Sequence, residues 1–86
     1  MNTNFQMLRE LLDKYHPETR GIVSLYEMDM IEETLHLDEM SIMQLRNLRD
    51  FTVSHLGRSD KMEDWDRMSA ICTVIDVKIS ELGGDV

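Results

Sequence analysis

The sequence has one cysteine and one proline among 86 residues, and it has no long apolar run. A single cysteine excludes an internal disulfide framework and suits a reducing compartment. No stretch approaches the ~18 apolar residues that a membrane-spanning helix requires, and the N-terminal segment lacks the uninterrupted apolar core of a signal peptide. These absences favour a cytoplasmic protein with no membrane association.

The short motifs of common enzymes are also absent. The sequence contains no glycine-rich phosphate loop, no Gly-x-Ser-x-Gly and no cluster of Cys and His residues. Cys72 has no histidine near it in the sequence and lies among isoleucines on an apolar stripe, so we predict a small buried side chain rather than a nucleophile. We therefore expect a protein that is not an enzyme and that needs no cofactor.

One acid–histidine spacing is compatible with a metal site. Glu33 and His36 have the Glu-x-x-His spacing found in di-iron helical bundles. Such a site needs a second copy and further buried glutamates, and the nearest second copy, Asp13 and His16, lies beside Pro17 at the end of a helix. Since the number of ligands rather than one spacing defines a site, we expect no bound metal.

Helical periodicity, in contrast, extends along the whole chain. Apolar residues recur every three or four positions, which predicts an all-α fold with a single domain over residues 1–86. We expect a small bundle of about four amphipathic helices at residues 4–15, 24–36, 39–56 and 60–82, with the long C-terminal helix in a central position. Ser24 with Glu27, and Ser41 with Gln44, have the spacing of capping boxes. Gly57 is the expected left-handed end of the third helix.

The only tryptophan begins an apolar stripe along the last helix. The stripe follows a three-four spacing that is typical of helices packed at a shallow angle, and it consists of Trp65, Met68, Cys72, Ile75, Ile79 and Leu82. We therefore predict that Trp65 faces the core. Asp64 and Asp66 flank the stripe and serve as favourable charges in the first turn.

The same helix carries apolar residues outside this stripe. A chain of 86 residues has few elements with which to cover a second apolar face, and small helical chains often gain core by oligomerising. We therefore predict a homodimer whose interface includes Ile71, Val74 and Val77.

Basic residues are scarce and unevenly placed. Nine Lys and Arg stand against 17 Asp and Glu, so the formal net charge is −8. No Lys or Arg occurs between Gly21 and Leu45, where six acidic residues are concentrated. This balance repels phosphate backbones and favours a basic protein partner. We therefore expect no direct nucleic-acid binding, although Arg46, Arg49 and Arg58 leave a helical DNA-binding regulator as a weaker alternative.

Methionines and a tyrosine lie next to these acidic residues, and flexible thioethers rimmed by carboxylates suit a partner with apolar and basic groups. The sequence thus predicts a small acidic protein-interaction module of the phage or bacterial accessory type. Such a module would regulate or inhibit a larger, basic-surfaced protein, such as a nucleic-acid-handling or defence complex. The alternative is a small cytoplasmic chaperone or adaptor that shields a helix of its partner. The predicted partner-binding residues are Tyr26, Glu27, Asp29, Met30, Glu32, Glu33, Glu39, Met40 and Met43.

Overall fold

The computed structural model describes residues 3–84 and confirms the all-α fold. The helices are α1 (Asn4–Lys14), α2 (Leu25–Leu35), α3 (Ile42–Leu56) and α4 (Met62–Glu81), and a short 3-10 turn, η1 (Leu37–Glu39), connects α2 to α3. Each of the four helices begins and ends within three residues of its predicted bounds. Along residues 3–84, no helix combines the length and the apolarity needed to cross a lipid bilayer.

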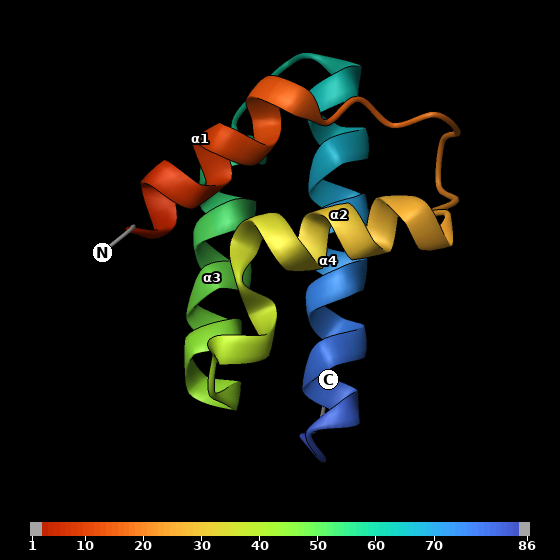
Figure 1. Ribbon diagram of the computed structural model, residues 1–86. Coiled ribbons are helices and arrows are strands. Elements are labelled where there is room, and N and C mark those ends of the chain that lie inside the picture. The colour runs from red at the N-terminus through yellow and green to blue at the C-terminus, as the bar shows by residue number, and fades with distance from the viewer. Residues whose placement is uncertain (1–2, 85–86) are drawn as a thin grey trace.

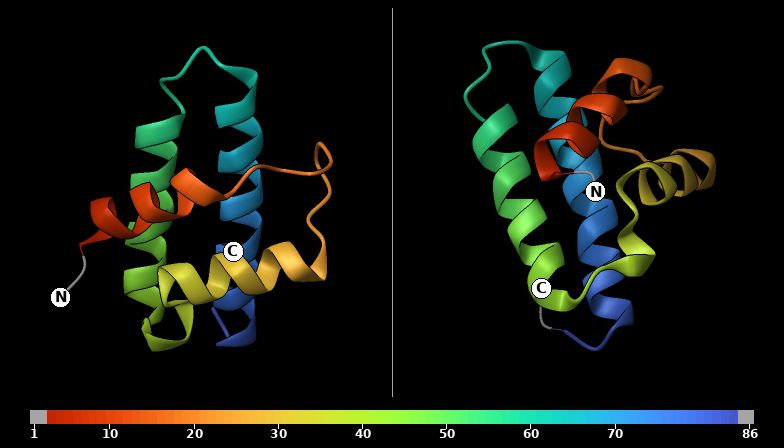
Figure 2. Two further views of the ribbon diagram at one scale, coloured as in Figure 1. Left: turned by 45° about the horizontal axis from the view of Figure 1, so that its top comes forward. Right: turned by 60° about the vertical axis from the view of Figure 1, so that its left-hand side comes forward.

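The four helices form two crossed layers. α3 and α4 lie side by side and run in opposite directions, joined by a short loop (Figure 1). α1 and α2 lie across the same side of this pair, with α1 packed on α3 and α2 packed on α4 (Figure 2). The two layers bury one apolar core between them, which leaves the outer side of α1 and α2 open to solvent.

Reciprocal side-chain caps fix where three of the helices begin. In each capping box, a Ser or Thr hydroxyl accepts from a backbone N–H three residues later, and the side chain at that position accepts from the N–H of the cap. The pairs are Thr3–Gln6, Ser24–Glu27 and Ser41–Gln44. The two boxes predicted from the sequence are therefore confirmed.

The prediction for the end of α3 is wrong. Gly57 has right-handed angles, φ −67° and ψ −14°. Its small size matters for a different reason, because a Cβ at this position would collide with the carbonyl oxygen of Val53. The left-handed conformation occurs instead at His36, which ends α2 with φ 55°, and at Gly83, which follows α4 with φ 87°.

α4 is buried over a wider face than the predicted stripe. Ile71 and Ile75 are fully buried, and Ala70 and Val74 are buried as well. The reason is that both α2 and α3 pack against α4, so the chain itself covers the face assigned to a partner copy. Ile71 and Val74 therefore belong to the core of one chain, and their assignment to a dimer interface is wrong. Val77 is 38% exposed, and dimerisation itself stays a prediction.

Trp65 lies at the edge of this buried face. Its side chain is 46% exposed, so the predicted inward orientation is wrong. The core-facing direction of α4 runs between Ile71 and Ile75, which places Trp65 roughly 100° away around the helix. The indole N–H donates to the backbone carbonyl oxygen of Ser59 at 2.8 Å. Trp65 thus ties the start of α4 to the preceding loop.

The substitution Trp65→Phe is expected to lower the free energy of unfolding by about 1 kcal/mol. It removes one hydrogen bond, and the carbonyl oxygen of Ser59 can then accept a hydrogen bond from water instead. Urea unfolding followed by circular dichroism measures this change. A loss of about 3 kcal/mol or more, typical of a truncated core residue, would contradict the half-exposed position.

Candidate partner-binding surface

The predicted partner-binding residues separate into two groups. Seven of them are exposed or half-exposed along α2, η1 and the start of α3: Tyr26, Asp29, Met30, Glu33, Glu39, Met40 and Met43. The other two, Glu27 and Glu32, form contacts inside the chain. The acidic surface is therefore smaller than the sequence indicates.

Glu27 is a buried structural carboxylate with 3% of its surface exposed. One of its oxygens accepts from the Tyr15 hydroxyl at 2.9 Å, and the other accepts from the Ser24 backbone N–H at 3.2 Å and the Ser24 hydroxyl at 3.0 Å. Burial acts to raise the pKa of Glu27, but the hydrogen bonds from Ser24, Tyr15 and the backbone of Glu18 outweigh it and leave the pKa below its ordinary value. The assignment of Glu27 to the partner-binding surface is wrong.

Lys78 pairs with two acids that have no Lys or Arg near them in the sequence. Its ammonium group lies 3.1 Å from a carboxylate oxygen of Glu32 and also contacts Asp38. Hydrogen bonds to Asp38 and Glu32 raise the pKa of Lys78, and the bond from Lys78 lowers the pKa of Asp38. Glu32 therefore connects α2 to α4 and adds no free charge for a partner.

Asp29 and Glu33 are exposed on α2. Within residues 3–84, neither carboxylate has an ion-pair partner, and the two lie one turn apart on α2. With Tyr26, which is 72% exposed, they border a hollow of about 420 Å³ between α2 and α1. The residues that line this hollow are Glu10, Lys14, Tyr26, Asp29, Met30, Glu33, Thr34 and His36.

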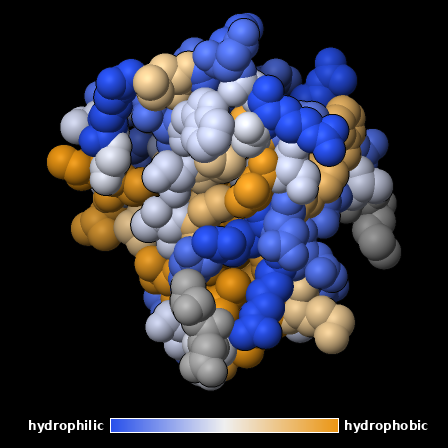
Figure 3. Space-filling view, turned by 180° about the vertical axis from the view of Figure 1, so that it is seen from behind, coloured by the Kyte–Doolittle hydropathy of each residue, from blue (hydrophilic) through white to orange (hydrophobic). Residues whose placement is uncertain are grey.

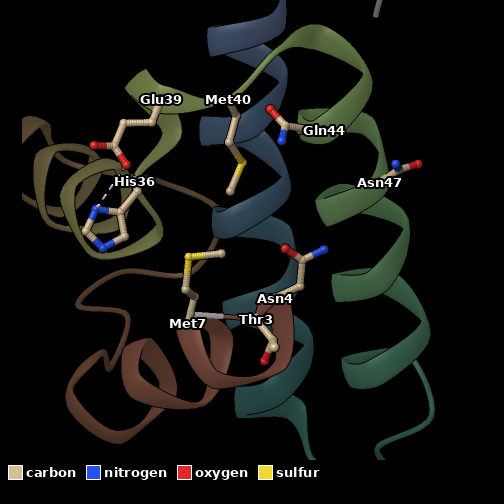
Figure 4. A pocket seen from close by; sticks show the side chains of 8 residues that line it. All are labelled: Thr3, Asn4, Met7, His36, Glu39, Met40, Gln44 and Asn47. Carbon is tan, nitrogen blue, oxygen red and sulfur yellow. Dashed lines mark ion pairs between the residues drawn. The ribbon is translucent and has the colours of Figure 1, made fainter. Parts of the chain in front are cut away.

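A second hollow, of about 540 Å³, lies where the other end of α1 approaches η1 and α3. Figure 4 shows Met7 extending from α1 and Met40 extending from the opposite wall, while His36 and Glu39 form an ion pair of 4.0 Å on one side. The lining residues are Thr3, Asn4, Met7, His36, Glu39, Met40, Gln44 and Asn47. Met43 is 73% exposed and lines neither hollow.

One arginine of the basic spot predicted on α3 is paired with an acid of α4. Arg49 donates to Asp76 of α4 at 2.7 Å, so part of the basic spot predicted from the sequence is neutralised within the chain. Cys72 lies near this pair and is half-buried, and burial raises the pKa of its thiol. On the side of the molecule away from α1 and α2, hydrophobic side chains form separate spots among hydrophilic ones (Figure 3).

Sequence reasoning missed the second wall of both hollows. Glu10 and Lys14 come from α1 and Asn47 comes from α3; only tertiary packing brings the first two beside α2 and the third to the hollow at η1. The one signal in the sequence is a row on α1, since Thr3, Met7, Glu10 and Lys14 are spaced four, three and four residues apart and share one face.

Comparisons with protein-family models, with curated proteins and with solved structures found no match to this chain. The charge and the shape of the two hollows are therefore the basis on which we infer a function.

Proposed function

We propose that this protein is a non-enzymatic interaction module that binds a basic and apolar surface of a larger protein through the face between α1 and α2. Binding would regulate or inhibit that protein. The observation that supports the proposal is the pair of carboxylates of Asp29 and Glu33, which have no ion-pair partner within the described part of the chain and border a hollow together with exposed Tyr26.

The charge of this face favours a cationic partner. Like charges one helical turn apart destabilise a helix by roughly 0.2–0.5 kcal/mol, so Asp29 and Glu33 repel each other in the free protein. Glu10 adds a third carboxylate from the opposite wall of the same hollow. A Lys or Arg from a partner would relieve this repulsion. The net charge of −8 would also speed the encounter with a basic surface, such as the groove of a nucleic-acid-handling complex.

The double substitution Asp29→Lys and Glu33→Lys tests the proposal. It keeps a like-charged pair on α2, so we expect the helix to form as before while the affinity for a basic partner falls about 100-fold, roughly tenfold per reversed charge. The measurement is affinity capture of the partner from cells that encode the protein, followed by titration of the isolated partner at two salt concentrations.

The matched control is Asp50→Lys with Asp60→Lys, which changes the net charge equally at exposed positions that line neither hollow. If both double variants lose the same affinity for the partner, the assignment of the binding surface to the α1–α2 face would be contradicted. An affinity that does not fall with salt would favour the apolar shielding of a chaperone instead.

A further inference from the structure

The two hollows lie one after the other along α1. The row Thr3, Met7, Glu10 and Lys14 supplies two residues to each hollow, and His36 lines both. We name the two hollows together the α1–α2 furrow, lined by the residues given above for each of them. α1 has 11 residues, so at 1.5 Å per residue the furrow is about 16 Å long, which equals three turns of a helix.

The chemistry of the furrow changes from one end to the other. The end near Tyr26 carries three carboxylates, from Glu10, Asp29 and Glu33, against the single ammonium of Lys14. The other end carries the thioethers of Met7, which is mostly buried, and of Met40 among mostly uncharged polar side chains, and Glu39, paired with His36, is its one carboxylate (Figure 4). A ligand that fills the furrow therefore needs cationic groups toward one end and apolar groups toward the other.

We propose that the α1–α2 furrow binds one amphipathic helix of about three turns that presents Lys or Arg to Glu10, Asp29 and Glu33 and an apolar side chain to Met7 and Met40. This inference rests on the proposed function and specifies the ligand of the same face.

The shape of the furrow favours a helix over an extended segment. One wall is a row of side chains on α1, and at the acidic end the opposite wall is a row on α2; two such helical rows can receive the ridges of a third helix. A peptide that binds as a strand needs an open sheet edge, and no strand occurs within residues 3–84. Methionines line grooves that accept amphipathic helices because the thioether adapts to different apolar side chains.

The charge of the furrow argues against a second copy of this chain as the ligand. A partner helix must bring cations to Glu10, Asp29 and Glu33, and the chain as a whole carries a net charge of −8. A basic helix from another protein would supply these cations.

The test uses two synthetic 14-residue peptides made of Leu, Lys and Ala. In the first, the leucines have helical spacing on one face, and in the second the same sequence carries two central D-residues that prevent a helix. Titration of the ¹⁵N-labelled protein should show the helical peptide binding at least tenfold more tightly. Amide shifts should change along both hollows, including Met7 and Met40 at one end and Glu33 at the other.

The variant Asn4→Trp blocks the furrow without changing its charge. Asn4 is the first residue of α1, and Figure 4 shows its side chain extending from α1 toward Gln44 on the opposite wall. We expect this variant to lose at least tenfold in affinity for the helical peptide. Ser80→Trp, at an exposed position of α4 that lines neither hollow, should bind as the wild type does.

Equal affinity for the two peptides, with shift changes limited to Glu10, Asp29 and Glu33, would overturn the helical ligand and leave the acidic face as a binding surface. Binding of neither peptide at low salt would also overturn the furrow as a helix site, whereas the proposed function would still be decided by partner capture with the Asp29 and Glu33 variant. The comparison of the two peptides uses the wild-type protein, so it does not depend on the folding of Asn4→Trp.

Discussion

Val74→Glu is expected to unfold the chain at neutral pH. Val74 is 3% exposed in the middle of α4, where the helix meets the layer formed by α1 and α2. A carboxylate buried there without a paired cation costs several kcal/mol. Domains have about 5–15 kcal/mol of stability, and a chain of 86 residues lies toward the low end. The variant should lose its helical circular dichroism signal and its amide dispersion.

Val77→Glu is the matched control, because this position lies three residues further along α4 and is 38% exposed. It should fold, with a free energy of unfolding within about 1 kcal/mol of the wild type. Sedimentation of the wild type, Val74→Glu and Val77→Glu gives the oligomeric state of each protein. It distinguishes a core position, where the substitution unfolds the chain, from an interface position, where the substitution separates a dimer into folded monomers. A Val74→Glu protein that folds and sediments as half of a wild-type dimer would contradict the placement of Val74 in the core.

The positions of the helices could be predicted because the signals that set them are local. Ser24 with Glu27 and Ser41 with Gln44 are three residues apart, and each pair forms its capping box in the structure. The buried face of α4 could not be predicted in the same way. Apolar residues occur on most sides of this helix, so periodicity alone did not decide which of them would meet α2 and α3. The stripe through Trp65 was therefore right only in part: Ile75 and Ile79 are buried in the core, whereas Trp65 is 46% exposed.

The candidate site was predicted in part, and the errors share one physical cause. Asp29 and Glu33 lie on the open face of α2 as expected, and Tyr26 lies beside them. Glu27 and Glu32 differ because their partners are distant in the sequence. Tyr15 precedes Glu27 by 12 residues and Lys78 follows Glu32 by 46. The density of acids in a segment therefore overstates the free charge of a folded surface.

Glu27→Ala is expected to lower the free energy of unfolding by about 3 kcal/mol. The substitution removes the side chain that closes the capping box with Ser24, which contributes about 1 kcal/mol, and it leaves the buried Tyr15 hydroxyl without its acceptor, which costs about 1–3 kcal/mol. Tyr15→Phe alone should cost about 1–2 kcal/mol. In a double-mutant cycle the two losses should add to more than the loss of the double variant. Simple additivity would contradict a direct interaction.

The same carboxylate predicts how stability depends on pH. Because hydrogen bonds hold the pKa of Glu27 below its ordinary value of 4.5, the unfolded chain takes up this proton at a higher pH than the folded chain. The contribution of Glu27 is therefore complete above about pH 4.5 and is lost as the pH falls through its folded pKa. Urea unfolding between pH 3 and pH 7 should show the Glu27→Gln variant losing less stability on acidification than the wild type. If the free energy of unfolding falls equally with pH in the two proteins, the hydrogen bonds from Tyr15 and Ser24 do not favour the ionised carboxylate.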